Sequence, residues 1–119
     1  MKKNQFIDYI NTNHKSSLNI YNTSFSNINN SKEVWWFTVS VSKFDSDFHL
    51  LLNTDHFGIW MHLPKGFVNQ LAASFKIRED RNAVDIEISA DNNFKYLKDI
   101  KSGGSEFDFT TFVKGKINY

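Results

Sequence analysis

The sequence predicts an α+β fold: a mostly antiparallel sheet of about five to six strands, one or two amino-terminal helices and a short helix after the third strand. Apolar residues alternate with period two from Glu33 onward, in segments separated by brief polar turns, which favours antiparallel strands. Before Glu33 the apolar spacing is helical. The chain has 119 residues, 40% of them hydrophobic, with twelve phenylalanines, so we expect a single domain over 1–119.

An Asn-rich amino-terminal segment, 1–31, carries two helix-like patterns. The apolar stripe Phe6–Ile10 predicts a first helix. A second stripe, at steps of three, four and three, predicts another helix and consists of Leu18, Tyr21, Phe25 and Ile28. Asn, Ser and Thr compete with the helix backbone for hydrogen bonds, so an ordered loop pinned by the same residues is the alternative.

The sheet domain is expected over 34–114. Val34–Val41 gives the clearest strand signal, because Trp35 and Phe37 alternate with Trp36 and Thr38. Further strands are expected at 48–52, 59–63, 84–88 and 94–100, with a polar turn at 43–47, a helix over 67–75 and a short helix or extended tail at 110–117. Gly58 is available for a positive φ in the loop between the second and third strands.

Composition excludes several classes of protein. The chain has no cysteine, which rules out disulfides, thiolate zinc sites and cysteine nucleophiles. No apolar run suits a signal peptide or a membrane span, so we expect a cytoplasmic protein without membrane contact. The net charge of +1 argues mildly against non-specific nucleic-acid binding, which usually depends on a basic excess.

Two groups of polar residues could carry chemistry. His49, His56 and His62 lie close in sequence, and His49 and His62 can meet on neighbouring strands opposite Leu50 and Met61. A metal site would need Asp47 or Asp55 as a third ligand; we interpret these histidines as polar sheet residues and predict no metal or cofactor.

Asp85 and Glu87 share one strand face, as in metal-dependent nucleases. The lysine that commonly follows two positions later is Ser89 here, so we interpret both acids as solvent-facing and predict no catalytic residue.

Binding features are stronger. The basic residues expected to form a strip are Lys76, Arg78, Arg81, Lys95, Lys98 and Lys101. Trp36 and Trp60 fall on the non-core side of their strands, and exposed aromatics beside basic residues suit both nucleic-acid platforms and protein hot spots. The alternative is that both tryptophans form a second core layer under the amino-terminal segment.

A set of apolar strand segments carries a family resemblance. They are Val34–Val41, Leu50–Leu52, Met61–Pro64, Asp85–Ile88 and Phe107–Val113. Together they resemble a small accessory domain of some restriction endonucleases and other mobile-element proteins, over roughly residues 34–114. The resemblance implies a non-catalytic role in contacting DNA or protein near bacterial defence, and it transfers no functional residue.

These observations lead to one main hypothesis and two alternatives. The main hypothesis is a non-catalytic binding protein of phage or mobile-element origin. It would dock on a defence protein such as a nuclease, as an anti-CRISPR or anti-restriction inhibitor does, or contact nucleic acid. The alternatives are a small metal-dependent nuclease using Asp85 and Glu87, with His62 as a further candidate, and a structural subunit that self-associates. The partner and the oligomeric state are left open.

Overall fold

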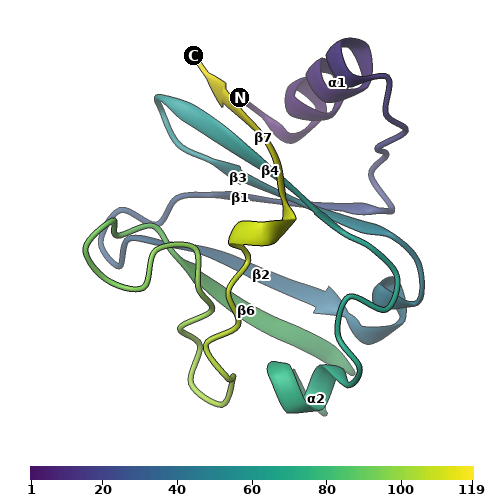
Figure 1. Ribbon diagram of the computed structural model, residues 1–119, viewed down its shortest axis with the longest axis vertical. Helices are drawn as coiled ribbons and strands as arrows, with labels where there is room; N and C mark the ends of the chain where they lie inside the picture. Colours follow the sequence, from purple (N-terminus) through teal and green to yellow (C-terminus); the bar gives the residue numbers. More distant parts are fainter.

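Seven strands in two sheets, with one long helix, make up the chain in a computed structural model that describes all 119 residues (Figure 1). The elements are, in chain order, α1 (Lys3–His14), β1 (Thr23–Asn27), β2 (Val34–Ser40), a 3-10 helix (Val41–Asp45), β3 (Phe48–Asn53), β4 (Phe57–Leu63), α2 (Leu71–Ser74), β5 (Lys76–Arg78), β6 (Ala83–Ser89), a 3-10 helix (Thr110–Phe112) and β7 (Val113–Asn118). The predicted α+β class is confirmed, but the strands divide between two sheets instead of one. None of the helices has the length and apolar character that a membrane crossing requires.

The first sheet, here called sheet A, has the strand order β1-β3-β4-β7, and sheet B has the order β2-β6-β5. All neighbouring strands are antiparallel except β1 and β3, which run parallel. In sheet A the register places His49 of β3 directly opposite His62 of β4. In sheet B it places Trp36 opposite Glu87, and Thr38 opposite Asp85.

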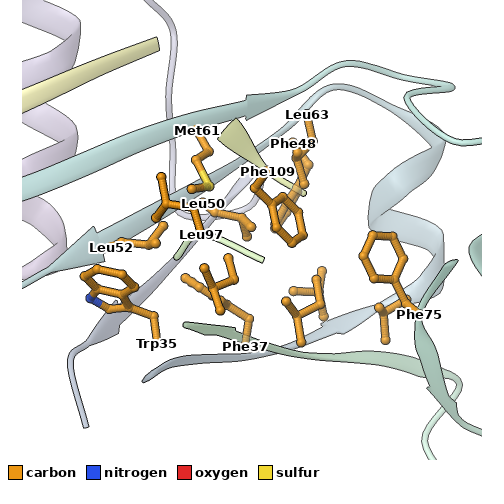
Figure 2. Packing of buried hydrophobic residues seen from close by; sticks show 14 of the residues in the cluster. Trp35, Phe37, Phe48, Leu50, Leu52, Met61, Leu63, Phe75, Leu97 and Phe109 are labelled. Atoms are coloured by element: carbon orange, nitrogen blue, oxygen red, sulfur yellow. The ribbon is translucent and has the colours of Figure 1, made fainter. Parts of the chain in front are cut away.

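The main core fills the space between the two sheets. Figure 2 shows Leu50 and Met61 of sheet A pointing toward Trp35 and Phe37 of sheet B. The indole N–H of Trp35 donates to the backbone carbonyl of Asn53 at 3.1 Å, so the ring is buried without an orphaned donor. Because strand side chains alternate, each sheet also has an outer face away from this core.

Helix α1 covers part of the outer face of sheet A, on the side away from sheet B (Figure 1). Phe6 and Ile10 of the helix are fully buried in a second cluster with Leu51 and Trp60. This confirms the helix predicted from the Phe6–Ile10 stripe. Leu51 points away from the main core, and an apolar residue is favoured there because α1 packs on it.

The second predicted helix is wrong. Residues after α1 form a loop and then β1, which pairs parallel with β3. Asn19 accepts hydrogen bonds from the backbone N–H groups of Tyr21 and Asn22 at 2.8 and 2.9 Å. The Asn19 side chain thus accepts hydrogen bonds from backbone N–H groups that a helix would use in its own ladder. Before β1 this stretch is therefore the ordered loop that was the alternative to a helix.

Other predictions from the carboxyl-terminal two-thirds also need correction. The expected strand at 94–100 is a turn with isolated bridges, because Lys95 and Leu97 have positive φ angles of 51° and 63°. The expected helix over 67–75 shrinks to the single turn α2, followed by the unpredicted short strand β5. The expected polar turn at 43–47 overlaps a 3-10 helix, and the tail is the strand β7 after a 3-10 turn. Gly58 lies inside β4 without a positive φ.

Candidate functional site

The two tryptophans of the predicted platform have different environments. Trp36 of β2 is 44% exposed on the outer face of sheet B. Trp60 of β4 is only 6% exposed, because α1 and the loop after it cover that part of sheet A. The prediction of an exposed tryptophan is therefore wrong for Trp60, which belongs to the second core layer.

Trp36 is the centre of a mixed-charge surface on the outer face of sheet B. The ammonium groups of Lys32 and Lys101 lie 5.2 and 5.4 Å from its ring centroid, within cation–π range. Lys101 also lies 3.8 Å from the carboxylate of Glu87, the residue opposite Trp36 in β6. We call the residues Lys32, Trp36, Glu87 and Lys101 the Trp36 surface. Two ammonium groups lie over its aromatic ring, one of them paired with a carboxylate, and the ring remains partly exposed to solvent.

Half of the predicted basic strip is paired with neighbouring carboxylates. Arg78 lies 3.5 Å from Asp80 and 3.8 Å from Asp85. Lys95 pairs with Glu106, and this ion pair lowers the pKa of Glu106. Lys101 pairs with Glu87, whereas Lys76, Arg81 and Lys98 have no ion-pair partner. The strip is thus not a continuous row of free cations.

The acidic pair proposed for a nuclease alternative is engaged by other side chains. Asp85 is buried and accepts a hydrogen bond from the Thr38 hydroxyl at 2.8 Å, in addition to its contact with Arg78. It does not face solvent as the sequence predicts. His62 lies on the outer face of sheet A, with the main core between it and Asp85. The structure therefore does not bring the three nuclease residues together.

A second candidate site is a hollow of about 540 Å³ on the outer face of sheet A. It lies between the loop that follows α1 and the outward-facing residues of β3 and β4. We call it the histidine hollow; its lining residues are His14, Ser16, Ser17, Leu18, Asn22, Asp47, His49, Trp60, His62 and Lys114.

The floor of the histidine hollow is a chain of stacked and hydrogen-bonded rings. His49 and His62 stack with ring centroids 4.7 Å apart, as their opposed positions in β3 and β4 require. The Trp60 indole N–H donates to Nδ1 of His49 at 3.0 Å. His62 bonds through Nε2 to Asp47 at 3.1 Å. The expected approach of His49 and His62 is confirmed, and Asp47, not Asp55, joins them.

Burial and proximity set the charge of this chain of residues. Burial, together with repulsion from His62, lowers the pKa of His49 from 6.5 to about 4, so the ring is neutral near pH 7. The pKa of Asp47 is lowered by hydrogen bonds from the Lys65 backbone N–H and from His62. Asp47 is therefore a carboxylate, and its negative charge faces His62.

The arrangement does not form a metal centre. No group of three or more His, Cys, Asp or Glu side chains in the chain is placed to hold a metal ion. Nδ1 of His49 accepts from Trp60 and so has no free lone pair for a cation. Chemically, the hollow presents a neutral imidazole beside a histidine–carboxylate pair.

Comparison with known proteins gives no relative: no protein-family model, curated protein or solved structure matches the chain. The resemblance to a restriction-associated accessory domain stays a prediction.

The alternation of β3 and β4 in the sequence predicted that His49 and His62 meet and offered Asp47 as their neighbour. It missed Ser16, Ser17 and Lys114, because only the folded chain brings the loop after α1 and the strand β7 to the same hollow.

Proposed function

We propose that the protein is a non-catalytic binding protein that docks on another protein through the Trp36 surface. The observation that supports this most directly is the indole of Trp36, 44% exposed on the outer face of sheet B. Tryptophan and arginine are enriched at protein-binding hot spots, where burying a large ring on association contributes much of the affinity. The ammonium groups of Lys32 and Lys101 lie within cation–π range of this ring.

The charge pattern around Trp36 favours a protein partner over nucleic acid. A nucleic-acid surface gains affinity from unpaired cations that replace the counterions of phosphates. Arg78, Lys95 and Lys101, three of the six basic residues of the predicted strip, instead have carboxylates within ion-pair distance, and one of these carboxylates, Glu87, lies opposite Trp36. A partner with an apolar pocket for the indole and charges of both signs around it complements this surface.

The first partner class to test is a protein of a bacterial defence system, such as a nuclease. This choice rests on the restriction-associated resemblance described above and on the proposed phage or mobile-element origin. A small protein that covers the active site or the substrate-binding surface of a nuclease inhibits it without being an enzyme itself. The self-associating subunit is a competing outcome, which light scattering of the purified chain distinguishes by its mass.

Capture from a bacterial lysate with the tagged wild-type chain tests the proposal. Trp36→Ala is the test variant, and Tyr21→Ala is the matched control, because Tyr21 is 71% exposed with the Lys43 ammonium 5.8 Å from its ring centroid. We expect a specific protein that survives nuclease treatment and binds Trp36→Ala at least about 30-fold more weakly, the loss of about 2 kcal/mol typical of a hot spot. Tyr21→Ala should bind like wild type.

Two results would contradict docking through Trp36. One is equal capture by wild type and Trp36→Ala, with circular dichroism showing that both are folded. The other is recovery that disappears after nuclease treatment, which would assign the surface to nucleic acid; a steep salt dependence of the affinity would then accompany it.

A further inference from the structure

Several polar side chains of the histidine hollow have no partner within the chain and can donate a hydrogen bond. Because the indole of Trp60 donates to Nδ1 of His49, the neutral ring must carry its proton on Nε2. This Nε2–H has no acceptor within the chain. Asp99 Oδ2 is the one fully enclosed side-chain polar atom without a partner, so Nε2 of His49 is accessible from the hollow that the residue lines. Trp60 thus acts as a positioning residue for an N–H donor.

The remaining walls add donors and a positive charge. Lys114 of β7 is exposed and has no ion pair or side-chain hydrogen bond in the chain. The hydroxyls of Ser16 and Ser17, in the loop after α1, also make no hydrogen bond within the chain. Asp47 is the one carboxylate at the hollow, and both its oxygens are already acceptors, Oδ1 from the Lys65 N–H at 2.9 Å and Oδ2 from His62.

We propose that the histidine hollow binds a small molecule through a phosphate or carboxylate group. An oxyanion accepts several hydrogen bonds at once, so it complements the His49 N–H, the serine hydroxyls and the Lys114 ammonium. The volume of about 540 Å³ exceeds that of a single oxyanion and lies in the range of small-molecule sites. This site faces away from the Trp36 surface and does not depend on the proposed protein docking.

Titration of the full chain with inorganic phosphate and with acetate tests this site by NMR of the histidine side-chain nitrogens. We expect saturable shifts of the His49 and His62 resonances. His56 is the internal control, because it is exposed in the turn between β3 and β4 and does not line the hollow. Sodium chloride at matched ionic strength controls for general screening.

A pair of lysine variants makes the test specific. Lys114→Gln removes the cation at the hollow, whereas Lys116→Gln removes one that lies 4.4 Å from the ring centroid of Phe57. Both residues are exposed, so both variants should fold. We expect Lys114→Gln to weaken anion binding about tenfold or more, as the loss of a charge-assisted hydrogen bond does, and Lys116→Gln to leave it unchanged.

The outcomes separate the ligand classes and the proposal itself. Saturable binding of phosphate alone indicates a phosphorylated ligand, and binding of acetate alone indicates a carboxylate; either supports the site. The proposal is overturned if neither anion gives saturable shifts, if chloride gives the same shifts, or if the two lysine variants weaken binding equally. None of these results bears on Trp36, so the two proposals fail independently.

Discussion

Acidification tests the buried imidazole of His49 through its effect on stability. Burial and the neighbouring His62 lower its folded-state pKa from 6.5 to about 4, and the other titratable groups around it are Asp47, His14 and Lys114. In the unfolded chain His49 binds a proton at its ordinary pKa of 6.5. Between pH 6.5 and about pH 4 the unfolded state is therefore protonated at His49, whereas the folded state is not. Stability is therefore fully present above pH 6.5 and is lost as the pH falls toward 4.

The magnitude follows from the size of the shift. One pKa unit corresponds to about 1.4 kcal/mol, so the full shift is worth about 3 kcal/mol, and about 2 kcal/mol of it is lost between pH 7 and pH 5. Both the wild type and a variant lose further stability as carboxylates titrate. The informative quantity is therefore the difference between them, not the wild-type curve alone.

Urea unfolding at a series of pH values measures this difference. His49→Gln cannot titrate and retains an oxygen that can accept the Trp60 N–H, while His56→Gln removes an exposed histidine as the control. Between pH 7 and pH 5 we expect wild type to lose about 2 kcal/mol more than His49→Gln, and the same amount as His56→Gln. Parallel curves for wild type and His49→Gln would refute the assignment of a buried, neutral imidazole.

Two further predictions concern close packing and a buried acid. Gly58→Ala would place a Cβ 2.5 Å from the Phe6 ring, so we expect thermal unfolding to show a loss of about 1 to 3 kcal/mol, while Gly115→Ala, whose Cβ lies at an ordinary 3.7 Å from Trp60, should be nearly neutral. Burial raises the pKa of Asp99, so wild type should lose stability relative to Asp99→Asn as the pH rises above 3.8. Hydrogen bonds from Thr110 lower the pKa of Asp108, so wild type should lose stability relative to Asp108→Asn as the pH falls below 3.8. Urea unfolding at a series of pH values measures both trends. Equal effects of the two glycine variants, or the same trend for the two aspartate variants, would contradict these assignments.

Local alternation was enough to predict the strands at the centre of the molecule. β2, β3, β4 and β6 each carry apolar residues at every second position, because each has one face on the main core. The same rule predicted that His49 and His62 meet. Periodicity within a strand depends only on which face is buried, so it reveals the strands but not how they divide into two sheets.

The elements that were missed depend on non-local contacts or on unusual backbone angles. β1, with the sequence TSFSN, has little strand character and exists because it pairs with β3 some 26 positions later, as in Thr23 and His49. The segment 94–100 has strand-like composition, but Lys95 and Leu97 adopt left-handed angles, and the segment pairs only through isolated bridges at Lys98 and Asp99. Nothing in those side chains signals a positive φ, which L-residues rarely adopt.

Trp36 and Trp60 show why exposure could not be derived from strand register. Each points away from the main core, so the alternation of apolar residues in the two strands predicts the same exposure for both. The difference arises from α1, whose Phe6 and Ile10 pack on sheet A and on no part of sheet B. Because the helix ends at His14, it buries Trp60 but leaves His49 and His62 beside an open hollow. The length of α1 therefore determines which part of the outer face of sheet A is covered and which part remains as the proposed ligand site.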